Sequence, residues 1–110
     1  MKPARVKFPK AQGNKTEQAF GLRLLSQKQR GEILWYAYEP FKLRLAKTTF
    51  YTPDFAAVWE DGAILIYEVK GFWRDDARVK IKVAARLFPF FQFFAVTKDN
   101  ALWTFEEIGV

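Results

Sequence analysis

The chain contains no cysteine and no histidine. Without cysteine it has no disulfides and no thiolate metal site, and this absence fits a reducing compartment such as the cytoplasm. Without histidine it has no His-ligated zinc site and no histidine general base. A metal ion bound to this protein would therefore take oxygen ligands, as Mg²⁺ and Mn²⁺ do.

Long hydrophobic runs are also missing. The longest apolar stretch, residues 87–96, is interrupted by Pro89 and Gln92, so it is too short to span a bilayer, and no signal peptide opens the chain. Hydrophobic residues nevertheless make up 50% of the sequence and aromatic residues 18%, which predicts a packed core rather than disorder. A chain of 110 residues has room for one domain.

Acidic residues are scarce relative to basic ones, with 12 Asp and Glu against 18 Lys and Arg, and the resulting net charge of +6 favours a polyanionic partner. The first 15 residues contain no acid at all. We expect residues 1–15 to form a flexible basic arm in front of a single domain of residues 16–110. The arm residues expected to contact nucleic-acid phosphates are Lys2, Arg5, Lys7, Lys10 and Lys15. A merely solvated terminus is the alternative.

The strongest chemical pattern lies in residues 51–71, where two strand-like runs flank a turn at Asp61-Gly62. The second run begins apolar on both faces, which predicts an interior strand, yet one face ends in Glu68 and Lys70. Buried charges are costly unless they pair or bind something. If the two strands pair through the turn, Asp54 converges with Glu68 and Lys70 at one end of the sheet. A purely structural salt bridge of Lys70 with a carboxylate is the alternative.

These side chains suit metal-assisted phosphodiester hydrolysis, because carboxylates bind Mg²⁺ and a lysine can orient water or stabilise developing charge. The pattern of Pro53-Asp54 followed by Glu68-Val69-Lys70 resembles the PD-(D/E)xK nuclease superfamily. With the basic helix that follows, the chain is most similar to small phage endonucleases of the endonuclease I type, which resolve Holliday junctions. The resemblance implies an α/β fold with a restriction-endonuclease-like core, in which helices flank a mixed β-sheet.

A first helix is predicted over residues 14–30. Phe20 and Leu24, with Leu25 on the flank, supply its core-facing stripe, and Gly21 permits a close approach of the helix to the sheet. The sequence therefore places a helix with one buried face before the first strand.

Glu17 lies three residues after Asn14, which is the spacing of a capping box at a helix start. The resemblance implies a further metal ligand on the first helix, and Glu17 is the matching residue. The alternative is that Glu17 only caps the helix, since the two roles compete for one carboxylate.

The remaining elements are predicted from periodicity and turn residues. Residues 33–38 and 41–46 are expected to be strands, the second an outer strand leading into the central hairpin. A helix is expected over residues 76–88. Residues 90–97 should then form a strand parallel to the hairpin's second strand, through a right-handed crossover, with a last strand over residues 102–105.

The helix of residues 76–88 carries basic side chains at four-residue spacing and no acid after Asp76. We interpret this row as a track for DNA phosphates, with a bland basic surface as the alternative. The DNA-binding residues expected in this helix and the preceding loop are Trp73, Arg74, Arg78, Lys82 and Arg86. Phe72 and Trp73 are interpreted either as base-stacking residues or as core residues.

The resemblance therefore implies a Mg²⁺- or Mn²⁺-dependent DNA endonuclease that leaves 5′-phosphate and 3′-hydroxyl ends. The metal ligands would be Asp54, Glu68, Glu17 and the Val69 carbonyl, with Lys70 as the further catalytic residue. Branched DNA is the implied substrate and a homodimer the implied state, in the cytoplasm of a bacterial or phage-infected cell and without membrane association. Two alternatives stay open: another nuclease of this superfamily, such as a nicking, transposon-end or single-strand-specific enzyme, and a catalytically silent DNA-binding module of the same fold.

Overall fold

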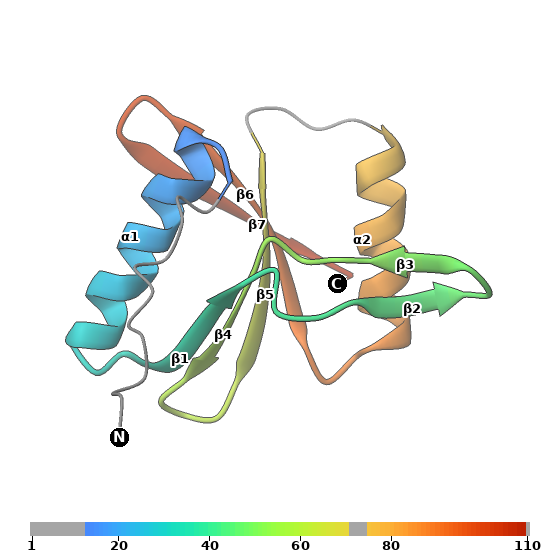
Figure 1. Cartoon of the computed structure of the whole chain (residues 1–110), viewed down its shortest axis with the longest axis horizontal. Helices are drawn as coiled ribbons and strands as arrows, with labels where there is room; N and C mark the ends of the chain where they lie inside the picture. The colour runs from blue at the N-terminus through green and yellow to red at the C-terminus, as the bar shows by residue number, and fades with distance from the viewer. Residues whose placement is uncertain (1–12, 71–74, 110) are drawn as a thin grey trace, which may run out of the picture.

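The computed structural model describes residues 13–70 and 75–109. A five-stranded sheet runs through the molecule with strand order β1-β4-β5-β6-β7 (Figure 1). Its strands are β1 (Ile33–Tyr38), β4 (Phe55–Trp59), β5 (Ile64–Lys70), β6 (Gln92–Asp99) and β7 (Leu102–Ile108). Neighbouring strands are antiparallel except β5 and β6, which run parallel, as predicted. The fold is thus mixed α/β with a mostly antiparallel sheet flanked by helices.

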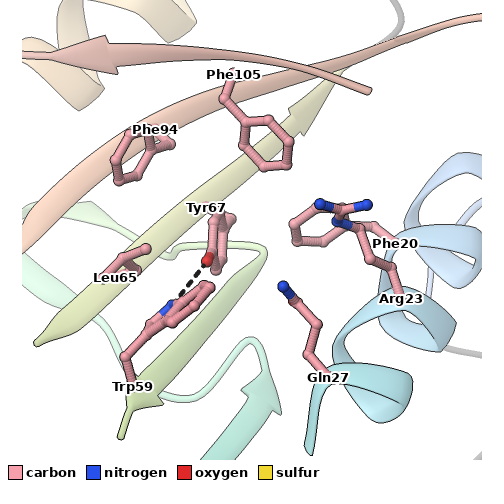
Figure 2. A pocket seen from close by; sticks show the side chains of 8 residues that line it. All are labelled: Phe20, Arg23, Gln27, Trp59, Leu65, Tyr67, Phe94 and Phe105. Carbon is pink, nitrogen blue, oxygen red and sulfur yellow. Dashed lines mark hydrogen bonds between the residues drawn. The ribbon is translucent and has the colours of Figure 1, made fainter. Parts of the chain in front are cut away.

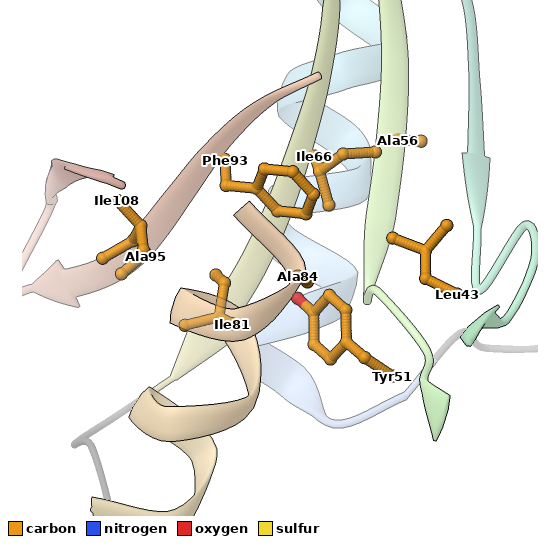
Figure 3. Packing of buried hydrophobic residues seen from close by; sticks show 9 residues of the cluster. All are labelled: Leu43, Tyr51, Ala56, Ile66, Ile81, Ala84, Phe93, Ala95 and Ile108. Carbon is orange, nitrogen blue, oxygen red and sulfur yellow. The ribbon is translucent and has the colours of Figure 1, made fainter. Parts of the chain in front are cut away.

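Two helices lie on opposite faces of this sheet, α1 (Lys15–Gln29) on one and α2 (Asp75–Leu87) on the other (Figure 1). The central strand β5 contributes to the core on both sides. Ile66 packs in the cluster beneath α2, which Figure 3 shows, whereas Tyr67 and Val69 pack in the cluster beneath α1. The prediction of an interior strand covered on both faces is therefore confirmed. Neither described helix is long and apolar enough to cross a membrane.

Helix α1 begins with the predicted capping box. The Glu17 N–H donates to Asn14 Oδ1 at 2.9 Å, and the Asn14 N–H donates to Glu17 Oε1 at 2.9 Å. Phe20 and Leu24 are buried as expected. Leu25, expected on the flank of this stripe, is exposed. The reason is that consecutive helix residues point about 100° apart, so Leu25 falls outside the buried face.

The hairpin of β4 and β5 places its two strands as the sequence predicted. Its turn is closed by hydrogen bonds from the Trp59 N–H to the Ala63 carbonyl and from the Gly62 N–H to the Trp59 carbonyl. Gly62 has φ +89°, a conformation that favours glycine. The register pairs Phe55 with Tyr67 at the far end of the hairpin, which fixes what lies beside the last residues of β5.

The region before β4 differs from its prediction. Residues 41–46 were expected to give an outer strand, but β2 (Leu43–Ala46) pairs with β3 (Thr49–Tyr51) in a separate two-stranded sheet. We call this pair the β2–β3 arm; it packs against α2 (Figure 1). Its turn requires φ +57° at Thr48, which the sequence does not signal. The later strands are also displaced, because β6 begins at residue 92 rather than 90 and β7 continues to residue 108 rather than ending at 105.

Candidate active site

Asp54 lies in the segment that joins β3 to β4 and is buried, with 8% of its surface exposed. The Val69 N–H donates to Asp54 Oδ2 at 2.8 Å, which holds the carboxylate beside the end of β5. The hairpin register brings this about, because Phe55 pairs with Tyr67 and the preceding residue then lies beside the last residues of β5. The predicted proximity of residues 54 and 69 is thus confirmed.

Glu68 is the second buried carboxylate, with 7% of its surface exposed. The Tyr51 hydroxyl donates to Glu68 Oε1 at 3.0 Å, and Lys70 Nζ lies 3.2 Å from Glu68 Oε2. Lys70 itself is partly exposed. Glu68 and Lys70 lie on the α2 face of β5, two residues apart, because alternate residues of a strand share one face.

Electrostatics make ionisation of Asp54 unfavourable. Burial, the negative charge of Glu68, and the charge and hydrogen bonding of Glu17 raise the pKa of Asp54 to about 8, although the Val69 N–H opposes this shift. Glu68 and Glu17 therefore both act on Asp54 at short range. The end of β5 is a place where a further positive charge would be stabilised.

The same cluster shifts the pKa values of Glu68 and of its partners Tyr51 and Lys70. Burial raises the pKa of Glu68, while Lys70 and the Tyr51 hydroxyl oppose the rise. Burial also raises the pKa of Tyr51, and the Glu68 charge adds to it, so that Tyr51 remains a hydrogen-bond donor. For Lys70, burial would lower the pKa, but the charges of Glu68, Asp54 and Glu17 outweigh it and the pKa is raised. Lys70 is therefore a cation throughout the neutral range.

Glu17 reaches this cluster from the N-terminus of α1. Its charge and hydrogen bonding act on Asp54, yet its Oε1 also accepts the capping hydrogen bond from the Asn14 N–H. The structure thus places Glu17 next to Asp54 while it serves as a helix cap. Its role as a metal ligand stays a prediction.

Tyr38 and Gly13 enclose Glu17. Burial and the charges of Glu17, Glu39 and Asp54 raise the pKa of Tyr38. Gly13 has φ +80°, and a Cβ atom there would collide with the Glu17 carboxylate and the Tyr38 hydroxyl. Glycine is therefore required at position 13 for Glu17 to keep this place.

Among residues 13–70 and 75–109, no group of three carboxylates is arranged to hold a metal ion. The donor chemistry at Asp54 and Glu68 nevertheless fits a hard divalent cation. Two buried carboxylates lie at the end of β5, where Glu68 pairs with Lys70, and carboxylate oxygens are ligands that Mg²⁺ takes. The ion would offset the burial that raises the pKa of both groups and, at Asp54, the repulsion by Glu68.

A groove of about 350 Å³ opens beside Glu68, between the end of the β2–β3 arm and α2. Besides Glu68, its lining residues are Phe50, Tyr51, Thr52, Asp76, Ala77 and Lys80. Lys80 Nζ donates to the Phe50 carbonyl at 3.3 Å and so ties α2 to the arm. The groove has the volume of a small-ligand site and leads to a buried carboxylate, which suits the approach of a substrate.

The basic row predicted on α2 has an acidic partner at its first residue. Arg78 makes two hydrogen bonds to the Glu106 carboxylate of β7, at 3.2 and 3.3 Å, so the row begins on the β7 side of α2. Lys82 and Arg86 are exposed and follow at four-residue spacing. The basic residue of α2 that borders the groove is instead Lys80. Whether the row of Arg78, Lys82 and Arg86 contacts DNA stays a prediction.

Most of the other residues predicted to contact DNA lie outside the part of the chain that the structure describes. Lys15 is exposed at the start of α1. Outside the described residues lie Lys2, Arg5, Lys7, Lys10, Phe72, Trp73 and Arg74.

Sequence reasoning did not assign roles to Tyr51 or Tyr38, and it placed Lys80 only beside the basic row of the second helix, not at the groove. One signal for Tyr51 was available, since a tyrosine whose ring is buried in a core needs a partner for its hydroxyl. Lys80 had no such signal, because its position depends on how the β2–β3 arm packs against α2.

No protein-family model matches the chain, and no curated protein is significantly similar to it. The function is therefore argued from the geometry of the site and from the sequence pattern that it contains.

Proposed function

We propose that the protein is a metal-dependent endonuclease that hydrolyses phosphodiester bonds of DNA. The observation that carries this proposal is the pair of buried carboxylates, Asp54 and Glu68, with Lys70 beside Glu68 and an open groove that Glu68 lines. A cation that binds oxygen ligands, a lysine that stays positive and an accessible groove are the parts that phosphodiester hydrolysis needs.

A structural ion pair explains the arrangement less well. Glu68 with Lys70 alone would be neutral, and such a pair needs no second buried acid. Asp54 adds a second buried carboxyl group, which accepts a hydrogen bond from the Val69 N–H. Like charges buried together are unfavourable unless a cation joins them.

The expected ligands of Mg²⁺ or Mn²⁺ are Asp54 and Glu68, with Glu17 and the Val69 carbonyl added from the resemblance. When bound, the ion polarises the phosphate and lowers the pKa of water at the site. Lys70 would position the attacking water or stabilise the charge that develops on the phosphate. Lys80 lies in the groove wall, where its ammonium group is suited to a phosphate of the bound strand.

The order of the elements supports a restriction-endonuclease-like core. A helix, strands, a hairpin that carries the acidic residues, a second helix and a strand parallel to β5 follow one another along the chain. Branched DNA as substrate, 5′-phosphate products and a homodimer are taken from the resemblance of the Asp54 and Glu68-Val69-Lys70 pattern to small phage endonucleases.

The experiment is to incubate the protein with a labelled four-way junction and a matched linear duplex, in Mg²⁺, Mn²⁺ or EDTA. We expect symmetric cuts in the junction that EDTA abolishes and that Asp54→Asn and Lys70→Ala reduce by roughly 10²-fold or more. A separate readout is the melting temperature, which Mg²⁺ should raise for the parent protein but not for Asp54→Asn.

The Glu17→Gln variant separates the two roles of this residue. Glutamine serves as well as glutamate at this position of a capping box, so the helix should keep its stability. We expect cleavage to fall, because an amide binds Mg²⁺ less well than a carboxylate. Unchanged cleavage would leave Glu17 as a helix cap only.

The cleavage assay of the parent protein has two further outcomes. Equal cutting of duplex and junction would discard the junction preference, and DNA binding without cleavage in either metal would overturn the nuclease proposal.

A further inference from the structure

A second hollow lies on the opposite face of the sheet from Glu68 and Lys70. It has a volume of about 220 Å³ and opens between α1 and the strands β4 to β7 (Figure 2). Phe20, Arg23 and Gln27 of α1 face Trp59, Tyr67 and Phe105 of the sheet across this space, which we call the α1 pocket. Phe105 is 39% exposed, so the pocket is accessible from solvent on the β7 side.

Aromatic rings make up most of the walls. Tyr67 lies 4.9 Å from Phe20, 6.1 Å from Phe94 and 6.4 Å from Phe105, measured between ring centroids. The volume is below the range of about 300–1,000 Å³ for sites that hold drug-sized ligands. The pocket therefore suits one flat ring system rather than a larger molecule.

Polar groups in the pocket can read the edge of such a ring. The Tyr67 hydroxyl accepts a hydrogen bond from Trp59 Nε1 at 3.2 Å, so it still has its own proton to donate. Gln27 is 7% exposed, and its side chain, which also hydrogen-bonds the Glu32 carboxylate, extends toward the space beside Tyr67 (Figure 2). Glutamine amides pair with the donor and acceptor groups of nucleobases.

Cations lie beside two aromatic rings on this face of the sheet. The Arg23 guanidinium lies 5.4 Å from the centre of the Phe105 ring, and Lys98 Nζ lies 5.3 Å from that of Trp103. Glu107 pairs with Phe94 across β6 and β7, so it shares this face and would repel a phosphate. A phosphate next to a base in the pocket would therefore lie on the Arg23 side. Aromatic rings interleaved with cations are typical of sites that bind unpaired nucleic-acid bases.

We propose that the α1 pocket binds one unpaired nucleobase of a DNA strand, with Arg23 at the adjoining phosphate. The choice of DNA rests on the proposed function, but the site lies on the other face of the sheet and needs neither the metal nor Lys70. It would give the protein a preference for DNA with unpaired bases.

The test uses the Asp54→Asn protein in EDTA, so that binding is measured without cleavage. Fluorescence anisotropy gives Kd for a single-stranded oligonucleotide and for the same sequence as a duplex. Phe105→Ala should weaken single-strand binding roughly ten- to hundredfold, because one stacking ring is lost, and should change duplex binding less than twofold. Arg23→Ala should also weaken single-strand binding, and Gln27→Met should alter the order of preference among homopolymers of the four bases.

Leu102→Ala is the matched control, since Leu102 is a 74% exposed apolar residue of β7 on the opposite face from Trp103 and Phe105. It should leave both affinities unchanged, and circular dichroism checks that each variant is folded. Unchanged single-strand affinity in Phe105→Ala, or an equal loss on duplex, would overturn the proposal. It would also be overturned if Phe105→Ala converted a dimer to a monomer without changing single-strand affinity. If Phe105→Ala loses single-strand affinity while the parent protein cuts no DNA in Mg²⁺ or Mn²⁺, the nuclease function would be refuted and the base site would stand.

Discussion

At the scale of single residues, Asp54 links the proton affinity of the site to the stability of the protein. Its pKa is about 8 in the folded protein, against an ordinary value of 3.8. The folded state thus holds this proton more tightly than the unfolded chain. The contribution of Asp54 to the free energy of unfolding therefore falls as the pH rises from about 4 through 8.

The Asp54→Asn variant tests this linkage. Asparagine keeps an oxygen that can accept the Val69 N–H but cannot ionise, so in EDTA we expect the variant to match the parent protein near pH 5. Near pH 9 it should be more stable, by roughly 1–3 kcal/mol, because no buried charge forms. Thermal unfolding between pH 5 and pH 9 measures this, and 1 kcal/mol corresponds to a shift in Tm of about 4 °C or more. Parallel stability curves for the two proteins would contradict the raised pKa.

The residues of the site were predictable to different degrees. Alternation along β5 and the turn at Asp61-Gly62 are local, and they sufficed to bring Asp54 and Glu68 together. Tyr51 was not predictable as a partner of Glu68, because their contact depends on how the β2–β3 arm folds back. Local patterns thus located the charged residues but not the groups that hold them in place.

At the scale of elements, prediction succeeded where periodicity is strong. Helix α1, strand β1 and the β4–β5 hairpin have clear patterns and lie within a few residues of their predicted positions. The β2–β3 arm was missed because Thr48 adopts φ +57°, a conformation that β-branched residues rarely take. Strand β7 was predicted too short because Glu106 and Glu107 have low strand propensity, yet Ile108 packs in the core.

Gly21 offers a test of how α1 packs. A Cβ atom at this position would lie 3.5 Å from the Phe55 ring, which is an ordinary contact, so the close approach does not require glycine. We expect Gly21→Ala to raise the free energy of unfolding by roughly 0.5–1 kcal/mol, because alanine loses less backbone entropy in a helix. Urea unfolding measures the change.

Gly109→Ala is the matched control for this substitution. Gly109 has φ +89°, and a Cβ atom there would lie 2.7 Å from the Ala85 Cβ, so this variant should be destabilised. Destabilisation by Gly21→Ala as well would show that α1 lies closer to the sheet than described.

At the scale of the whole molecule, four of the basic residues behind the net charge of +6 precede residue 13 in the sequence. Deleting residues 1–12 removes Lys2, Arg5, Lys7 and Lys10 but keeps the capping box of α1. If all four contact phosphates, the slope of log Kd against log salt concentration on duplex DNA should fall by up to about 3.6. Anisotropy at several salt concentrations, with Asp54→Asn in EDTA, measures the slope. An unchanged slope would identify the segment as a solvated terminus.

The β2–β3 arm is joined to the site at two points, through Tyr51 to Glu68 and through the Phe50 carbonyl to Lys80. The hydrogen bond from Tyr51 favours the ionised form of Glu68. Moving the arm away would therefore leave Glu68 without this donor, and by reciprocity an ionised Glu68, as a bound cation would keep it, favours the arm in place. Whatever docks on the arm would act as an effector of the carboxylate without touching it.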